Sequence, residues 1–441
     1  MTRQPGRLAP QERRALLAGP VYRVIGTPVV AALGLVNTAI IVRETGPEVF
    51  GLVALIATIT LLLPFADLGI GATVLSAGAQ LSQPELRQKS VDVIRRSYQV
   101  LFGVAAAIAV ASVVLMAVDG WQVLVGFSSG GQDRWAITVA ALIWALTIPA
   151  GLGLRILIGI DRNPLATLVM MSCPAFGLLL TLLLWSVDVS GIWYCISALG
   201  GLLVGQLVGT VLALRLSGLG RSAFGRVSRE GAKERLLAGS LWLFVVGLGL
   251  PIGLQSGRVL LAHLSNPEQL SSYSLMAQIY GIGWSVISTA GLAYWPVFVK
   301  RRAARDETVR MWWRITAVFA GIAVLAAVGM WALGPWAARI LSGGTITVSA
   351  WLALGFGLLL VCQAVHLPAS VLLTLPTEAR WLASWTLLMA VVSIGLGCWW
   401  APMWGATGVV TAAALAILCA QIIPDLSWTP RLVRRRPSAN A

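Results

Sequence analysis

Apolar residues in this sequence occur in long runs that are separated by short polar segments. A helix needs about 20 mostly apolar residues to cross a bilayer, and a sliding window of that length finds about twelve such runs. The predicted spans cover residues 21–41, 52–75, 98–118, 135–159, 166–186, 193–214, 238–264, 272–298, 312–333, 348–373, 383–400 and 404–423. The pattern predicts an all-α, polytopic membrane protein.

The longest hydrophilic connection lies between the sixth and seventh predicted spans. It divides the chain into two halves of six spans with the same orientation, the arrangement of parallel repeats in transporters. A short internal similarity supports the division, because Gly46-Pro47-Glu48 in the first half matches Asn266-Pro267-Glu268 in the second. The expected organisation is an N-terminal tail (1–20), an N-lobe (21–214), a linker (215–237), a C-lobe (238–423) and a basic tail (424–441).

Composition narrows the class of protein. Hydrophobic residues make up 58% of the chain and charged residues only 11%, whereas a soluble domain averages about 25% charged residues. Soluble, disordered and disulfide-rich secreted proteins are therefore excluded. The five cysteines lie in apolar runs without a C-x-x-C pair, and the two histidines, His263 and His366, lack neighbours at ligand spacing. No metal site and no cofactor are predicted.

The distribution of positive charge along the chain indicates its orientation in the membrane. The net charge is +15, and 28 of the 32 Lys and Arg residues fall on one side when the N-terminus is placed inside. Positive residues are retained in cytoplasmic loops, so both termini are expected in the cytoplasm. Only Arg43, Arg134 and Arg339 fall in outer loops, and Arg258 falls within a span. Since the charge is topological and forms no stripe on a soluble domain, a nucleic-acid partner is excluded.

Two ionisable residues lie well inside predicted spans, Asp67 in the second and Arg258 in the seventh. Burying such a group costs about 2.5–3.5 kcal/mol on insertion scales, which makes each a candidate functional residue. For Arg258, an ion pair between helices and a cation that meets an anionic substrate both stay open. For Asp67, pairing with an arginine and binding of a coupling proton or cation stay open.

Further polar residues interrupt the apolar spans. Arg23 and Arg155 lie near inner span ends, where they either extend toward the headgroups or contact substrate. His366 either relays a proton or makes a structural hydrogen bond. Asn37, Gln255 and Gln278 either line a wet cavity or bond neighbouring helices, and the sequence does not separate the two roles.

Signatures of enzymes are missing from the sequence. It contains no G-x-x-x-x-G-K-[ST] loop for a nucleotide phosphate. Its outer loops carry no paired carboxylates, which a lipid-dependent glycosyltransferase needs to hold a metal or act as a base. We therefore expect a carrier without catalytic residues rather than an enzyme.

Two motifs carry a family resemblance. IVRETGPEVFG at 41–51 and FADLGIG at 65–71 resemble the opening loop and second span of the Wzx-type polysaccharide flippases. These belong to the multidrug/oligosaccharidyl-lipid/polysaccharide (MOP) exporter superfamily. Arg258 with its flanking residues, Pro296, and GATG at 405–408 are similar to later parts of the family pattern. One departure is Gly257, where many members carry an acid, which puts an acid-dependent role at that position in doubt.

The resemblance implies a V-shaped, MATE-like pair of six-helix lobes in the bacterial inner membrane. It implies that polyprenyl-linked oligosaccharide is moved from the inner to the outer leaflet by alternating access. Arg258, and after it Arg23 and Arg155, would meet phosphate or acidic sugars, with Asp67 coupling to H⁺ or Na⁺ or positioning an arginine. Glycosyltransferases and the polymerase of the same pathway are the implied partners.

Other functions remain open. A cation-coupled small-molecule or multidrug antiporter of the same superfamily predicts an acidic binding site. A membrane-embedded glycosyltransferase or glycan polymerase predicts a long outer loop with acidic or arginine motifs, which this sequence lacks. A scaffold that recruits a synthesis complex through its basic loops is a further alternative.

Overall fold

The computed structural model of the chain describes residues 10–58, 70–126, 131–225, 241–292, 294–301 and 304–434. Every regular element in these ranges is helical, which confirms the all-α prediction. The first half contains α1 (Pro10–Ala57), α3 (Ile70–Gln80), α4 (Pro84–Ala117), α5 (Trp121–Val125), α6 (Gly131–Ala150), α7 (Leu152–Gly159), α8 (Asn163–Ser186), the short 3-10 helix η2 (Gly191–Cys195), α9 (Ile196–Leu216) and η3 (Gly220–Phe224). The second half contains α10 (Leu241–Leu264), α11 (Pro267–Leu292), α12 (Trp295–Lys300), α13 (Arg305–Leu341), α14 (Ala350–Leu372), α15 (Pro376–Ile417), the π-helical turn η5 (Leu418–Ile422) and α16 (Ile423–Arg434).

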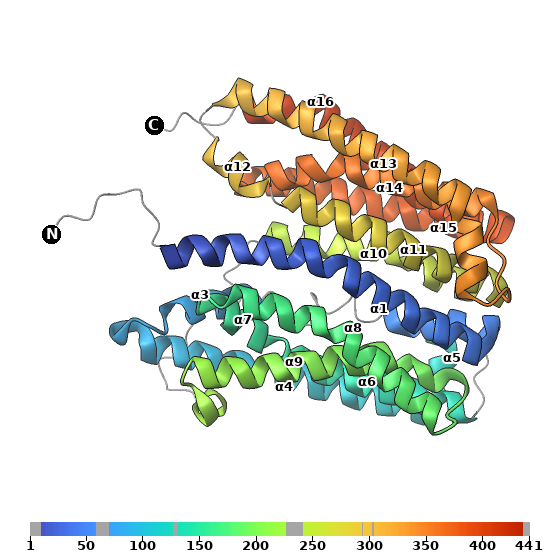
Figure 1. The fold of residues 1–441 in the computed structure, drawn as a ribbon, viewed down its shortest axis with the longest axis horizontal. Coiled ribbons are helices and arrows are strands. Elements are labelled where there is room, and N and C mark those ends of the chain that lie inside the picture. Colours follow the sequence, from blue (N-terminus) through green and yellow to red (C-terminus); the bar gives the residue numbers. More distant parts are fainter. Residues whose placement is uncertain are drawn as a thin grey trace.

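The helices form two bundles that lie side by side, with α1 along the boundary between them (Figure 1). Within the described ranges, nine helical stretches are long and apolar enough to cross a membrane. The first of these stretches, Gly26–Ala57, lies within α1, and the last, Glu378–Arg434, runs through α15 and α16. A glycine interrupts the helix in each, Gly46 in the first and Gly405 in the last. About twelve spans in two six-helix lobes account for this arrangement, and the chain is a multi-pass membrane protein.

Two glycines reverse the chain inside what otherwise reads as continuous helix. Gly46 has φ 74° and ψ 170°, and Gly405 has φ 55° and ψ −135°. Side chains rarely tolerate these backbone conformations, so glycine is required at both points. The Gln269 side-chain oxygen accepts a hydrogen bond of 2.8 Å from the Ala406 amide just after the second break. The expected break between the last two spans, at 401–403, therefore falls slightly later, at Gly405.

The chain also stays helical beyond its expected last span. The twelfth span was expected to end at 423, but α16 continues to Arg434 after the π-helical turn. It packs against α13 and α14. As a result Asp425, which the sequence assigned to the basic tail, is buried in the second half.

Glycines four residues apart form two ribbons that bring helices into close contact: Gly201, Gly205 and Gly209 on α9, and Gly249, Gly253 and Gly257 on α10. A Cβ atom at Gly201 would lie 2.5 Å from the Cα of Gly177 and 2.7 Å from the carbonyl oxygen of Cys173. In the second half, a Cβ at Gly253 would lie 3.0 Å from the Cα of Ala390. Helices α8 and α9, and likewise α10 and α15, are therefore packed backbone to backbone.

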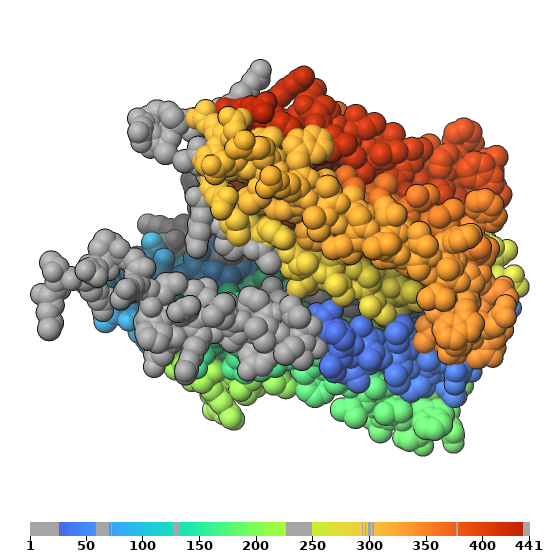
Figure 2. Space-filling view, turned by 45° about the horizontal axis from the view of Figure 1, so that its top comes forward, coloured from blue at the N-terminus to red at the C-terminus, as the bar shows by residue number. Residues whose placement is uncertain are grey.

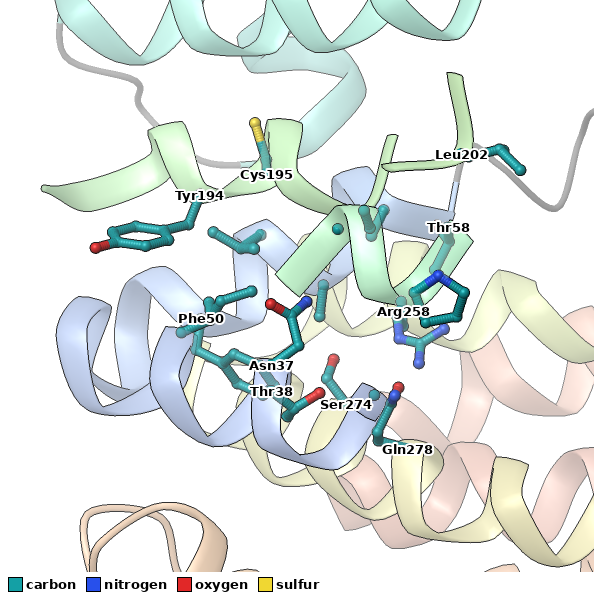
Figure 3. Close-up of a pocket in the computed structure, with 18 of the residues that line it drawn as sticks. Asn37, Thr38, Phe50, Thr58, Tyr194, Cys195, Leu202, Arg258, Ser274 and Gln278 are labelled. Carbon is teal, nitrogen blue, oxygen red and sulfur yellow. The ribbon is translucent and has the colours of Figure 1, made fainter. Parts of the chain in front are cut away.

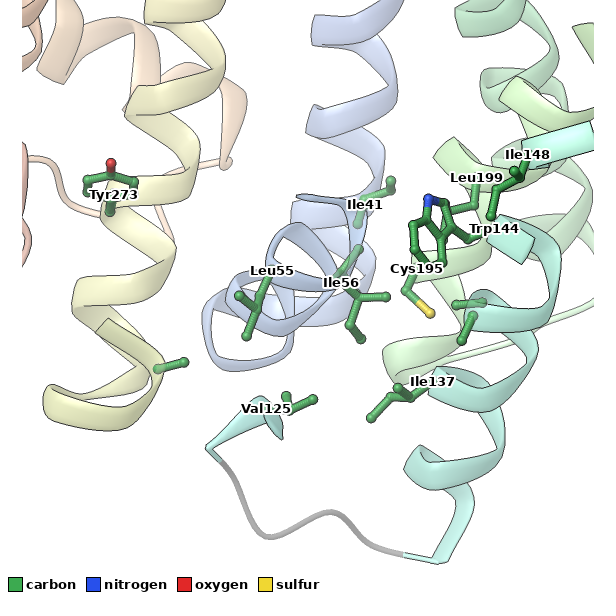
Figure 4. Close-up of a cluster of buried hydrophobic side chains, with 14 of the residues drawn as sticks. Ile41, Leu55, Ile56, Val125, Ile137, Trp144, Ile148, Cys195, Leu199 and Tyr273 are labelled. Carbon is green, nitrogen blue, oxygen red and sulfur yellow. The ribbon is translucent and has the colours of Figure 1, made fainter. Parts of the chain in front are cut away.

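A continuous apolar core runs through the first half and into the second. Ile41 and Ile56 of α1 lie toward Trp144 of α6 and Leu199 of α9, whereas Leu55 lies on the side of α1 nearer to α11 (Figure 4). Many large apolar side chains elsewhere remain outside any core; Leu325 is 75% exposed and Val391 is 69% exposed. Exposed apolar surface of this extent is expected where helices face lipid rather than water.

The two ends of the bundle differ. We call the end that carries the start of α1 and the end of α16 the terminal end, and the opposite end, with the Gly46 kink and α5, the distal end (Figure 1). At the distal end the halves touch: the Arg43 guanidinium donates to the carbonyl oxygen of Ile340 at 3.0 Å, and the Ser271 hydroxyl donates to that of Pro47. Toward the terminal end the surface is hollowed between the halves (Figure 2). The halves are therefore closed at the distal end.

Candidate functional site

A cavity of about 420 Å³ lies between the two halves. Its lining comes from α1, α8, η2 and α9 on one side and from α10 and α11 on the other (Figure 3). The Gly46 kink contributes to this geometry, because it folds the chain so that Asn37 before the kink and Phe50 after it both face the opening. The cavity is thus shared by the two halves.

A second cavity, of about 390 Å³, adjoins the first. The two share Gly34, Pro174 and Gln278, and the second continues along α1, α8 and α11 toward the terminal end. Its remaining wall includes Met170 and Met171. The shared residues make one compartment that is polar at mid-depth and more apolar toward the terminal end.

Arg258 brings a cationic side chain to the compartment from α10. Its Nη1 donates to the Gln255 side-chain oxygen at 3.0 Å, a contact made possible by their i, i+3 spacing on one helix face. Its Nε is buried and has no hydrogen-bond partner in the described part of the chain. No described carboxylate lies within ion-pair distance of this guanidinium.

Three more residues that line the same cavity, Asn37, Tyr194 and Ser274, carry buried polar atoms without a described partner. The Asn37 side-chain oxygen on α1 and the Ser274 hydroxyl on α11 are buried without a partner among the described residues. Figure 3 shows Asn37, Ser274, Gln278 and Arg258 around one opening. Buried polar atoms in folded proteins are almost always satisfied. The unsatisfied atoms of Arg258, Asn37 and Ser274 around one opening indicate a place where an anionic ligand with hydrogen-bonding groups can bind.

The structure brings together four of the residues singled out from the sequence. Arg258, Asn37 and Gln278 line the compartment, and Gln255 holds the Arg258 guanidinium. Arg155, by contrast, is exposed on α7 and does not line either cavity. The side chain of Arg23 and the whole of Asp67 lie outside the described residues.

His366 lies away from the compartment, in the interior of the second half. Its Nδ1 is 2.6 Å from the Asp425 carboxylate, and both side chains are buried. One turn earlier on α14, the Gln363 side-chain oxygen accepts a hydrogen bond from the Tyr280 hydroxyl. The contact joins α14 to α16, and both roles of His366, proton relay and structural hydrogen bond, stay predictions.

Sequence reasoning did not single out several lining residues. Thr38, Thr58 and Ser274 face the cavity, and Tyr194 and Cys195 approach it from η2. Ser274 lies shortly after the Asn266-Pro267-Glu268 segment that matches the first half, so this similarity was the available signal. Nothing in the sequence distinguishes the small hydroxyls on α1 from those that merely bond their own helix.

The fold is that of MOP-superfamily membrane transporters. The chain is similar to an inward-facing multidrug resistance MATE family transporter of the MOP superfamily (TM-score 0.71, 14% identity, 96% of this chain and 100% of that chain covered). It is also similar to the lipid II flippase MurJ in an inward closed conformation (TM-score 0.67, 14% identity, 93% of this chain and 87% of that chain covered). A third similar structure is an outward-facing MATE transporter of the MOP superfamily (TM-score 0.61, 15% identity, 96% of this chain and 97% of that chain covered).

Residues 16–302 match the family described as polysaccharide biosynthesis protein. The chain belongs to that family. No curated protein matches the sequence significantly.

Proposed function

We propose that the protein moves a polyprenyl-linked oligosaccharide, a precursor of cell-surface polysaccharide, from the inner to the outer leaflet of the bacterial inner membrane. The observation that carries the proposal is the half-buried side chain of Arg258. It lines a compartment between the halves, and its buried Nε has no partner in the described part of the chain. The family match and the transporter fold support it.

The chemistry of the compartment suits the head group of such a substrate. A buried charge without a partner costs several kcal/mol, so an anion that enters beside Arg258 is stabilised. Arginine binds phosphate oxygens through parallel, charge-assisted hydrogen bonds. Asn37 and Ser274 add hydrogen-bonding atoms of the kind that recognise sugar hydroxyls. The more apolar second cavity, lined in part by Met170 and Met171, suits the start of a lipid chain.

Charge distribution supports an orientation for this cycle. The Lys and Arg residues assigned to the inner side include those at the start of α4 and in α16, which lie at the terminal end. The compartment would then be accessible from the cytoplasm and closed toward the outside. The higher TM-score against the inward-facing than against the outward-facing MATE structure supports the same orientation. Rocking of one half against the other would expose the site alternately.

Flipping of a labelled lipid-linked oligosaccharide in proteoliposomes tests the proposal. We expect Arg258→Ala to reduce the flipping rate at least about 10-fold, the effect of losing one charge-assisted hydrogen bond of about 1.5–3 kcal/mol. Arg310→Ala is the matched control, because Arg310 is exposed on α13 and lines neither cavity. Normal flipping by a folded Arg258→Ala protein would refute the proposal for this site. Partial rescue by Arg258→Lys would show that charge matters more than bidentate geometry.

A second candidate, a cation-coupled multidrug antiporter, is favoured by the likeness to MATE transporters. Cationic drugs require an acidic site, whereas the described part of this compartment presents a guanidinium. The same proteoliposomes separate the two functions. Efflux of cationic dyes that survives in Arg258→Ala, with no movement of the lipid-linked glycan by the wild type, would favour the antiporter.

A further inference from the structure

His263 joins the two halves at the distal end. It stands in the last turn of α10, in the second half, and its side chain is exposed to solvent. Its Nδ1 lies 2.8 Å from the carbonyl oxygen of Val259, one turn back on the same helix. Its Nε2 lies 2.9 Å from the carbonyl oxygen of Val123 on α5, in the first half. One imidazole therefore spans the closed boundary.

Both ring nitrogens of His263 face carbonyl oxygens, and a carbonyl oxygen can only accept. A neutral imidazole carries one N–H donor and one lone pair, whereas the imidazolium carries two donors. Only the imidazolium can donate to Val259 and Val123 at the same time. In the neutral form one nitrogen lone pair would face a carbonyl lone pair across less than 3 Å, so the ring would turn away from one of the two.

Local structure explains why the ring meets Val123. His263 lies at the C-terminal end of α10, where a helix presents the negative end of its dipole. Val123 belongs to a helix so short that its carbonyl has no partner within it. Gly126, with φ 83°, lets this part of the first half approach closely, since a Cβ there would lie 2.6 Å from the carbonyl oxygen of Ala262.

Other ionisable groups lie on the helices around this contact. The described ionisable side chains on α10 and on the helices packed against it are Arg258 of α10, Arg43, Glu44 and Glu48 of α1, Glu268, Tyr273 and Tyr280 of α11, and Glu378, Arg380 and Cys398 of α15. Helix α5 carries none. Within the described part of the chain, His263 makes its hydrogen bonds to the two carbonyl oxygens alone. A change of charge on His263 therefore acts directly on the contact between the halves.

We propose that His263 is a proton-binding site that latches the distal end: the protonated ring holds the halves closed there, and loss of the proton releases them. The inference rests on the proposed function, in which the distal end must open toward the outside of the cell. A proton taken from the outer solution would then return the emptied transporter to the inward-facing state. By linkage, a state that binds the proton more tightly is favoured when protons are abundant.

Distance measurements across the distal end test the latch without any substrate. Spin labels carried by noncanonical amino acids at Ser190 and Ala350, both exposed at that end, leave the five native cysteines in place. Histidines gain or lose a proton between about pH 5 and 8. We expect the ratio of open to closed distal ends in the wild type to rise about 10-fold as the pH rises from about 5 to about 8. We expect no pH dependence for His263→Gln, which resembles the neutral ring.

A matched control is provided by Arg43→Gln. Arg43 also bonds across the distal end, to Ile340, but it keeps its charge at every accessible pH. That variant should raise the ratio of open to closed distal ends by the same factor at every pH and retain the pH dependence of the wild type. An unchanged pH dependence in His263→Gln, or none in the wild type, would overturn the latch.

A second measurement follows the protonation of His263 directly in the wild-type protein. The chain has two histidines, so ¹⁵N spectra of the imidazoles resolve them, with His263→Gln used only for assignment. Two protonated nitrogens on His263 at about pH 5, with one lost as the distal end opens, are expected. A ring that stays neutral at about pH 5 in the closed state would overturn the proposal. Either failure would leave the Arg258 test of transport untouched, because that test measures flipping at fixed pH.

Discussion

Replacement of Gly201 by alanine adds one methyl group at the tightest part of the packing between α8 and α9. The new Cβ would lie 2.5 Å from the Cα of Gly177 and 2.7 Å from the carbonyl oxygen of Cys173. Both atoms belong to backbone, so no side chain can rotate out of the way. The shortfall from an ordinary van der Waals separation is roughly 1 Å. The two helices must therefore move apart by about that distance.

The size of the effect follows from this overlap. Overpacking in a well-packed interior costs about 1–3 kcal/mol, and we expect Gly201→Ala in the upper part of that range. Close backbone approach is a main source of helix association in a bilayer, so separation also forfeits packing along the ribbon. Because Cys173 and Gly177 line the compartment, the same shift should slow flipping as well as lower Tm.

Thermal unfolding in detergent measures the effect with two controls. At Gly177, on the facing helix, the nearest atom to an added Cβ is 3.4 Å away, and at Gly103 nothing lies within 4 Å. We expect Gly177→Ala to cost less than Gly201→Ala and Gly103→Ala to leave Tm unchanged or raised. Equal Tm values for the Gly201 and Gly103 variants would refute the close-packing argument.

Three further predictions concern other parts of the chain. Gly405→Ala should lower the free energy of unfolding by about 1–3 kcal/mol, because Gly405 has a positive φ. Gly395→Ala, with open space around the added methyl group, should leave stability unchanged or raise it, and equal Tm values for the two variants would contradict this. Asp425→Leu should lower the free energy of unfolding by about 1–3 kcal/mol, because it leaves His366 buried without its partner. A double-mutant cycle with His366→Leu that gives zero coupling would refute a stabilising interaction between the two side chains. Gln255→Leu should lower the flipping rate at low substrate concentration about 10-fold, because it removes the hydrogen bond that orients the Arg258 guanidinium. An unchanged rate would show that this hydrogen bond does not orient the arginine.

The fold was largely predictable from the sequence because hydrophobic runs of span length have few alternative structures. In a bilayer every backbone polar group must be satisfied internally, which leaves helices for runs such as those around Leu202 or Leu360. The exact turn between the last two spans was not predictable, because Trp399, Trp400 and Trp404 make the whole segment apolar. The reversal is set by the backbone of Gly405, which hydrophobicity does not encode.

The site was predictable in part. An arginine within a span is costly, which is why Arg258 stood out, and it does line the compartment. Arg155 lay near a span end, where the sequence does not tell which way a side chain faces, and it is exposed. The partner of His366 was hidden because Asp425 follows the last apolar run and was assigned to the tail. A helix that continues past its apolar run leaves little trace in composition.

The hydrogen bonds between the halves at the distal end are weak enough for a transport cycle. In the described part of the chain three such bonds cross that boundary, from Arg43, Ser271 and His263. Each contributes about 0.5–1.5 kcal/mol, or up to about 3 kcal/mol where a charged donor is involved. Moving a two-state equilibrium from 1:99 to 99:1 requires about 5.5 kcal/mol of differential binding. Together the three bonds are of that order. Substrate bound at Arg258 and a proton lost from His263 can therefore jointly reverse the part of the preference that these hydrogen bonds contribute.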